Sequence, residues 1–254
     1  MTNDEYILSI VNKYKVADSI DFGTQILVIN PLQKFINSWA GNFLNEIKLS
    51  GSRAKGTAIK LSSDLDLFIS LKSDTPGTLK DIYNALYDEL IKQGVSARKQ
   101  NVSIGLNYIG HKIDLVPARR HTGNTNYHSL YRNKVDSWTQ TNVSNHINLV
   151  KSSGRTVEIM ALKIWRKQHN LDFPSIYLEL TVMDALYGKN KNQPADNFLT
   201  VLDYLRDNFV DKTVIDPSNT NNKISDDLFK YEKQAIASLA KESRNQQYWS
   251  SIIW

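Results

Sequence analysis

The hydrophobic pattern of this 254-residue chain changes once along its length. Up to about residue 118, stretches of alternating apolar and polar residues, which are typical of strands, are mixed with stretches of helical spacing. From about residue 154 onward the spacing is helical. The pattern therefore predicts an α+β protein of two lobes, an α/β lobe over 1–118 and a helical lobe over 119–254.

Single elements can be predicted within these lobes. We expect helices over about 3–17, from Pro31 onward, over 77–93, from about 154, from Pro174 to Gly188, over 196–209 and from Ser225 onward. We expect strands over 46–49, 65–69, 102–108 and 112–116. A loop is expected over 50–57 and a turn over 216–222. Residues 120–150 are polar and weakly patterned, and the basic cluster Arg119, Arg120 and His121 is expected in a loop. The first helix is expected to pack on the helical lobe.

The composition excludes several kinds of site. The chain has no cysteine, which excludes disulfides and cysteine-ligated zinc or iron–sulfur sites. Its 31 Lys and Arg residues outnumber its 26 Asp and Glu residues, a mild basic bias that is compatible with nucleotide or nucleic-acid partners. No apolar run approaches the roughly 18 residues of a membrane span, and the N-terminus carries acids where a signal peptide carries bases. We therefore expect a cytoplasmic protein with no membrane partner.

Three aspartates lie among apolar residues of predicted strands. Asp64 and Asp66 are two positions apart, so their side chains leave the same face of one strand. Asp114 lies between Ile113 and Leu115 on another strand, where a lone buried charge would be costly. Two such charges about 4 Å apart repel by about 4 kcal/mol at an effective dielectric constant of ~20. Mg²⁺ or Mn²⁺ would relieve this repulsion, and two ions about 3.5–4 Å apart can activate a hydroxyl and bridge a triphosphate.

The pair Gly51-Ser52 precedes these acids. Glycine allows a close approach of the backbone, and a serine hydroxyl with the following amides can bind phosphate oxygens at a helix start. The surrounding residues do not form the complete P-loop pattern G-x-x-x-x-G-K-[ST]. Taken alone, Gly51-Ser52 also fits an ordinary turn, and the two neighbouring acids also fit a solvated strand edge.

Taken together, a Gly-Ser pair, an Asp-x-Asp pair about a dozen residues later and a further lone Asp resemble the DNA polymerase β-like nucleotidyltransferase superfamily. The resemblance continues through residues 114–120, 158–187 and 216–227. It is nearest to the CD-NTase group, whose nucleotidyltransferase domain is called SMODS and which is similar to cyclic GMP–AMP synthase and oligoadenylate synthetases. It implies a polymerase β-like lobe with a mixed or antiparallel sheet, followed by a helical lobe.

The resemblance implies roles for residues of the first lobe. Asp64, Asp66 and Asp114 would be the catalytic residues and would hold two Mg²⁺ or Mn²⁺ ions. Asp114 would help to activate the acceptor hydroxyl. Gly51 and Ser52 would bind the nucleotide, with the Ser52 hydroxyl on the β- and γ-phosphates.

Two residues of the second lobe are implied as nucleotide ligands. Lys163 matches a lysine that contacts the triphosphate, and Tyr177 matches an aromatic or hydroxyl-bearing position near the nucleotide. Without the resemblance, Lys163 also fits a solvated basic flank of its helix, and Tyr177 also fits the core.

The implied function is metal-dependent joining of NTPs, ATP among them, into a cyclic or linear oligonucleotide second messenger with release of pyrophosphate, in bacterial anti-phage signalling. An alternative keeps the chemistry and transfers NMP to an RNA such as tRNA, to a protein or to a small molecule. The basic bias and the cluster at 119–121 motivate this alternative, and an RNA or protein could also serve as an activator. A third hypothesis is a nucleotide or RNA sensor without catalysis, or one half of a toxin–antitoxin pair, for which three converging acids would be unnecessary.

Overall fold

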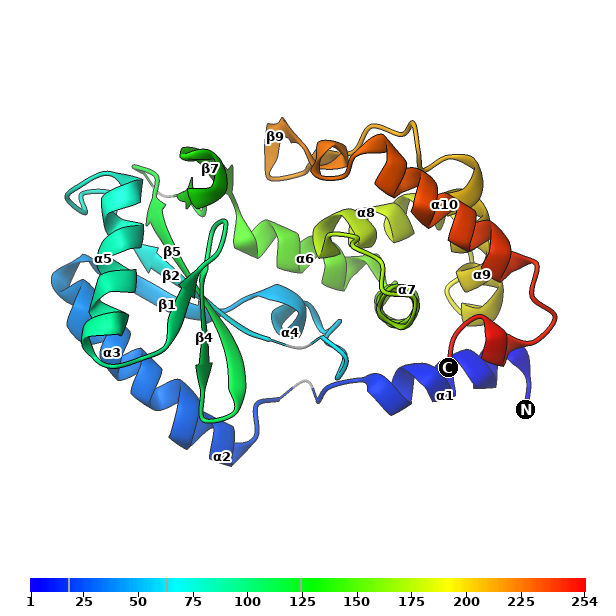
Figure 1. Ribbon diagram of the computed structural model, residues 1–254, viewed down its shortest axis with the longest axis horizontal. Helices are drawn as coiled ribbons and strands as arrows, with labels where there is room; N and C mark the ends of the chain where they lie inside the picture. Colours follow the sequence, from blue (N-terminus) through cyan, green and yellow to red (C-terminus); the bar gives the residue numbers. More distant parts are fainter. Residues whose placement is uncertain (18, 63, 124) are drawn as a thin grey trace. The chain divides into compact units, whose positions relative to one another are not determined.

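The computed structural model describes residues 1–17, 19–62, 64–123 and 125–254, and the chain divides into two compact units (Figure 1). Unit 1 comprises Met1–Val16, Gly56–Ser62 and Asn148–Trp254, and unit 2 comprises Ala17–Lys55 and Ser63–Ile147. Among the described residues, no helix is long and apolar enough to cross a membrane.

Unit 2 is built around a mixed sheet. Within its described residues, the strands lie in the order β1 (Leu44–Leu49), β2 (Leu65–Leu71), β5 (His111–Arg120), β4 (Ile104–Tyr108) and β3 (Ala97–Lys99), and β6 (His128–Arg132) pairs with both β5 and β7 (Ser137–Thr141). Strands β2 and β5 are parallel, and the other pairs are antiparallel. The predicted α+β class with a mixed sheet is confirmed.

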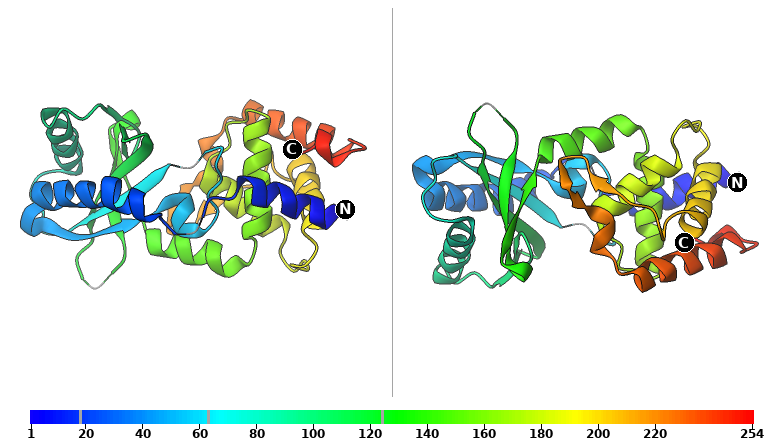
Figure 2. Two further views of the ribbon diagram at one scale, coloured as in Figure 1. Left: turned by 90° about the horizontal axis from the view of Figure 1, so that it is seen from below. Right: turned by 90° about the horizontal axis from the view of Figure 1, so that it is seen from above.

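One face of this sheet is covered by helices. Leu67 of β2 and Leu115 of β5 are buried in a core to which α3 (Asn30–Ala40) and α5 (Leu79–Lys92) contribute (Figures 1 and 2). Thr78 begins α5 with a capping box, because its hydroxyl accepts the backbone N–H of the residue three positions on, whose carboxylate accepts the N–H of Thr78. Since successive strand residues point to opposite faces, the even-numbered residues beside Leu67 and Leu115 face away from this core.

Unit 1 is helical. Its main helices are α1 (Asn3–Tyr14), α7 (Thr156–Gln168), α8 (Ser175–Ala185), α9 (Pro194–Asp207) and α10 (Lys230–Arg244), and a two-stranded ribbon of β8 (Ile215–Asp216) and β9 (Asn219–Lys223) precedes α10. Ile7, Ile10 and Val11 place α1 in the same core as α7 and α9 (Figure 2). The backbone N–H of Val16 donates to the carbonyl of Ala58 at 3.1 Å, which ties the segment after α1 to residues 56–62.

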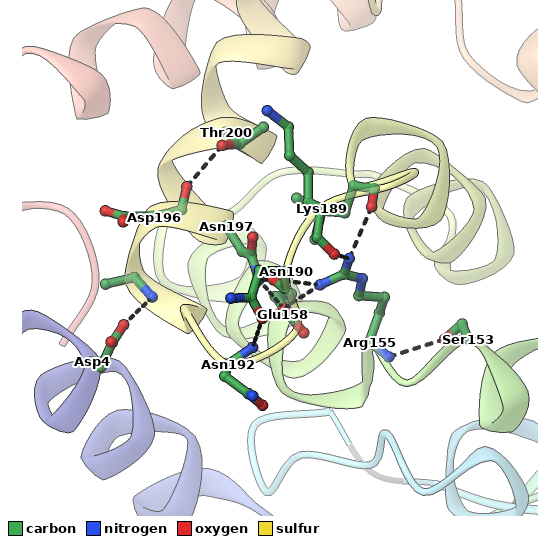
Figure 3. Close-up of polar contacts among 12 residues, drawn as sticks. Asp4, Ser153, Arg155, Glu158, Lys189, Asn190, Asn192, Asp196, Asn197 and Thr200 are labelled. Carbon is green, nitrogen blue, oxygen red and sulfur yellow. Dashed lines mark hydrogen bonds and ion pairs between the residues drawn. The ribbon is translucent and has the colours of Figure 1, made fainter.

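A buried polar network fixes the connection between α8 and α9 (Figure 3). Arg155 and Glu158 form an ion pair of 3.2 Å at the start of α7, and Arg155 Nη2 also donates to the carbonyl of Leu186 at 2.9 Å. Asn197 Nδ2 donates to Glu158 Oε1 at 2.7 Å and to the carbonyl of Asn190 at 2.8 Å. Because buried polar groups are costly unless they are paired, this network holds the 186–190 loop against two helices.

Several predicted elements are wrong in detail. The predicted loop over 50–57 contains the short helix α4 (Gly51–Lys55), and the helix expected from Pro31 is preceded by α2 (Phe22–Thr24) and a π-helical turn (Gln25–Ile29). The helix expected from Ser225 begins at Lys230, after a 3-10 turn (Ile224–Asp227). Further 3-10 turns lie at Gly41–Phe43, Asn133–Val135 and Trp249–Ser251.

The weakly patterned stretch 120–150 also contains regular structure. It forms β6, β7 and the first part of α6 (Val143–Ser153), and β5 runs on to Arg120, so that Arg119 and Arg120 lie in a strand rather than in a loop. Since β6 and β7 extend the sheet from β5, unit 2 continues to Ile147, whereas the predicted first lobe ends at 118.

Candidate functional site

Asp66 and Asp114 lie next to each other on the sheet of unit 2. They are partners in the parallel ladder of β2 and β5. Neighbouring strands are about 4.8 Å apart, and both residues face away from the helix-covered core, so the two carboxylates project from adjacent points of one face. Asp64 lies directly before β2. The sheet register therefore brings together the two acids that are distant in sequence.

The charge of Asp64 acts on Asp114. Burial raises the pKa of the Asp114 carboxyl above its ordinary value, and the negative charge of Asp64 raises this pKa further. Hydrogen bonds from Gln100 and Ser103 and the charge of Arg98 act in the opposite direction and lower it. Repulsion between Asp64 and Asp114 is thus an unfavourable interaction that a cation could offset.

Gly51 lies against the carboxylate of Asp66. A Cβ atom at position 51 would stand 1.7 Å from Asp66 Oδ2, and the φ of Gly51 is +62°, which disfavours other residues. The backbone N–H of Ser50 donates to the carbonyl of Asp66 at 2.8 Å, which fixes the turn into α4. Ser52 follows in α4 and is half-buried. The structure therefore brings Gly51 and Asp66 into contact, with Ser52 directly after them in the chain.

The residues of this face fit a divalent cation in their chemistry. Carboxylate oxygens are the ligands that Mg²⁺ and Mn²⁺ prefer, and Asp66 and Asp114 offer them side by side. In the part of the chain that the structure describes, no group of three or more His, Cys, Asp or Glu side chains is close enough together to hold a metal ion. The assignment of all three acids as metal ligands stays a prediction.

Lys163 lies in the interior of unit 1. Its side chain is 2% exposed, and its ammonium donates to Glu179 Oε1 at 2.7 Å and to Thr57 Oγ1 at 2.8 Å. A buried lysine needs such a partner, because an isolated buried charge is costly. The predicted contact of Lys163 with a triphosphate stays a prediction, and the structure shows this ammonium in a buried ion pair.

Tyr177 belongs to the core of unit 1. It is 0% exposed, and its ring packs on Phe173 and Phe209 with centroid distances of 5.3 Å and 5.0 Å. Its hydroxyl is buried and has no hydrogen-bond partner among the described residues, and burial raises its pKa to about 12. The ring therefore packs among core aromatic residues, with Lys233 Nζ over it at 6.0 Å from the centroid, and the nucleotide contact of Tyr177 stays a prediction.

Sequence reasoning missed the residues that surround Asp114. Gln100 Nε2 donates to Asp114 Oδ1 at 2.8 Å, and Ser103 Oγ lies 3.4 Å from Asp114 Oδ2. Gly105 is the ladder partner of Asp114 on β4. A glycine inside a strand pattern signals a close approach of another group, and this signal at Gly105 could have been used.

A cavity of about 610 Å³ lies elsewhere in unit 2. It is lined by the first residues of α5, by Arg119, and by residues of β6 and of the segment into β7, including Tyr131 and Trp138. Arg119 Nη1 donates to the carbonyls of Thr75 and Gly77 at 3.3 and 2.7 Å. None of the predicted acids lines this cavity.

The sequence comparisons match part of the chain to a known family. Residues 32–122 match the family described as "Nucleotidyltransferase domain". The cyclic AMP-AMP-AMP synthase of Escherichia coli (strain MS 115-1) is 24% identical over 177 residues, which are 62% of this chain and 55% of that protein. The match therefore spans about half the length of this curated relative. The predicted resemblance to nucleotidyltransferases is confirmed.

The structure comparisons extend the likeness to the whole fold. CdnC of E. coli MS115-1 with ATP has a TM-score of 0.77 at 19% identity, covering 96% of this chain and 91% of that one. The CD-NTase CdnG of Bradyrhizobium diazoefficiens with GTP has a TM-score of 0.74 at 12% identity, covering 96% and 92%. A complex of CdnC with HORMA-deltaN matches with a TM-score of 0.74 at 19% identity, covering 94% and 89%. At these identities the likeness shows a shared fold.

Proposed function

Because residues 32–122 form a nucleotidyltransferase domain, in a chain with the fold of the CD-NTases, we propose that this protein joins NTPs into a cyclic or linear oligonucleotide second messenger and releases pyrophosphate. The observation that carries the proposal is the register of β2 and β5, which puts Asp66 beside Asp114 on the face of the sheet that points away from the core with α3 and α5, with Gly51 against Asp66. In the reaction, a ribose hydroxyl of one nucleotide attacks the α-phosphorus of another, a new P–O bond forms, and the bond to pyrophosphate breaks.

Each residue of this face has a role in the proposal. Asp64, Asp66 and Asp114 would hold two Mg²⁺ or Mn²⁺ ions, which would lower the pKa of the attacking hydroxyl and stabilise the charge on the phosphates. The Asp114 carboxylate orients the acceptor hydroxyl. Gly51 leaves room for the Asp66 carboxylate, and the Ser52 hydroxyl donates to oxygens of the β- and γ-phosphates.

Substrate and partner follow from the relatives. The matched curated protein is named a cyclic AMP-AMP-AMP synthase and CdnC was solved with ATP, so we propose ATP as one substrate. CdnC also forms a complex with a HORMA protein, which supports a protein activator for this chain. Anti-phage signalling in a bacterial cytoplasm is the setting in which such a messenger would act.

The test is a product assay with matched variants. The protein is incubated with all four labelled NTPs and Mg²⁺ or Mn²⁺, beside Asp64→Ala/Asp66→Ala, and products are separated and weighed by mass spectrometry. Asp88→Ala, a change of an exposed acid on α5, is the control. We expect a phosphatase-resistant product that needs metal, is unchanged in the control and is lost in the double variant.

Other outcomes would redirect the proposal. A double variant that keeps its activity would mean that the assigned acids are wrong. Absence of any product from NTPs alone, together with transfer of label to added RNA or protein, would favour the alternative acceptor. Tight nucleotide binding without turnover under every metal would favour a sensor.

A further inference from the structure

The turn between β3 and β4 carries Gln100, whose side chain contacts Asp114. Gln100 Nε2 donates to Asp114 Oδ1 at 2.8 Å. Ser103 Oγ donates to Gln100 Oε1 at 3.1 Å, so both ends of the Gln100 amide are engaged. Because an amide has one donor end and one acceptor end, this pair of contacts fixes which end faces the carboxylate.

The backbone of the same turn is anchored to α5. The N–H of Gln100 donates to the carbonyl of Ser103 at 3.0 Å, and Tyr83 of α5 places its hydroxyl 2.9 Å from the carbonyls of both residues. Tyr83 is 1% exposed, and burial raises its pKa to about 12, so its hydroxyl stays a donor near neutral pH. The turn is therefore held in one position against α5, and β4, which follows it, pairs with the strand that carries Asp114.

Gly105 makes room for this contact. A Cβ atom at position 105 would stand 2.2 Å from Gln100 Nε2 and 3.1 Å from Asp114 Oδ1. The φ of Gly105 is not in the left-handed region, so the backbone there does not require glycine. The missing side chain is explained by the space that the Gln100 amide occupies.

We infer that Gln100 is a positioning residue for Asp114, held in place by Ser103 and Tyr83 and accommodated by Gly105. The inference rests on the proposed function, in which Asp114 is a ligand for a divalent cation. A hydrogen bond donated to a carboxylate favours its charged form and limits its rotation, and loss of such a partner of a metal ligand typically weakens metal binding by about 10–100-fold.

The test compares two glutamines that each donate to a carboxylate. Gln100→Leu removes the donor to Asp114, and Gln93→Leu removes an exposed bond of 3.0 Å to Glu89 on α5. Mn²⁺ binding is measured by calorimetry on the full chain without nucleotide, and kcat and KM are measured with NTPs. We expect Gln100→Leu to bind Mn²⁺ about 10–100-fold more weakly than the wild type. Its kcat should fall by a larger factor than its KM changes, and Gln93→Leu should match the wild type in all three quantities. Gln100→Glu, which faces one carboxylate with another, should be weaker still.

The possible results separate this inference from the proposed function. One result is that the wild type binds Mn²⁺, that Asp114→Asn weakens this binding and that Gln100→Leu leaves it unchanged. This result overturns the positioning role, and the proposed function stands. If the wild type neither binds Mn²⁺ nor forms a product, the proposed function fails and the inference with it. Should Gln100→Leu not fold, Ser103→Ala decides, since it removes the contact that orients the amide together with the 3.4 Å contact of Ser103 Oγ with Asp114 Oδ2. Unchanged Mn²⁺ affinity in a folded Ser103→Ala would overturn the inference.

Discussion

Gly51→Ala is the substitution whose effect follows most directly from the structure. The new Cβ would stand 1.7 Å from Asp66 Oδ2, whereas real contacts are not shorter than 3.0 Å, so the carboxylate or the turn must move by about 1.3 Å. The positive φ of +62° adds about 1–2 kcal/mol of backbone strain. Overpacking costs about 1–3 kcal/mol more. A displacement of about 1 Å at a reacting group can lower the rate by roughly 100-fold.

Gly94→Ala separates the backbone strain at a positive φ from the contact with Asp66. Gly94 ends α5 in the same unit with a φ of +75°, and a Cβ there would meet no atom within 4 Å. Both variants carry the backbone strain, so their difference measures the contact with Asp66. At about 2–4 °C per kcal/mol, Gly51→Ala should melt roughly 2–12 °C below Gly94→Ala. Thermal unfolding and the product assay check this. Equal melting temperatures together with equal product formation would refute the reasoning.

Three further predictions concern buried groups. Without divalent cations, Asp114→Asn should raise the melting temperature near pH 7. In the wild type the pKa of this carboxyl is raised in the folded state, so the stability of the wild type falls as the pH rises through that pKa. The difference in melting temperature between variant and wild type should therefore vanish as the pH falls towards 3.8, which a series of melting curves at different pH checks. Tyr177→Phe removes a buried hydroxyl without a described partner and should leave the melting temperature unchanged or higher; a marked loss would contradict this. Lys163→Met removes the ammonium from its buried pair with Glu179 and should cost about 3–5 kcal/mol in urea unfolding, and Lys163→Met/Glu179→Met should recover most of it; equal losses would argue against this pair.

The sequence predicted those elements whose conformation follows from local signals, such as apolar alternation and helix caps. Alternation of apolar residues located β2, and the acids on it could be assigned to one face because side chains alternate along a strand. The helix over 77–93 was also recognisable, since Thr78 caps α5 and Gly94 follows it with a φ of +75°. These signals are local, so a single sequence carries them.

The missed features depend on pairing between distant segments. Strands β6 and β7 are short and polar, and β6 becomes a strand because β5 offers an edge at Arg119 and Arg120. The bond from Gln100 to Asp114 depends on the register of β4 against β5, which no local pattern states. The site could thus be predicted as a set of acids, whereas the residues that position those acids required the structure.

The resemblance implies that the three acids and Lys163 contact the same nucleotide, but their surroundings in the fold differ. The charge of Asp64 raises the pKa of Asp114, an unfavourable interaction that a cation beside these acids could offset. Lys163 is paired with Glu179 inside unit 1, so its ammonium has a counter-charge without a nucleotide. The variant Lys163→Met/Glu179→Met therefore decides its role, because it removes the ammonium together with its carboxylate partner. If ATP binds this double variant as tightly as the wild type, Lys163 is structural; if affinity falls while the melting temperature holds, Lys163 contacts the nucleotide.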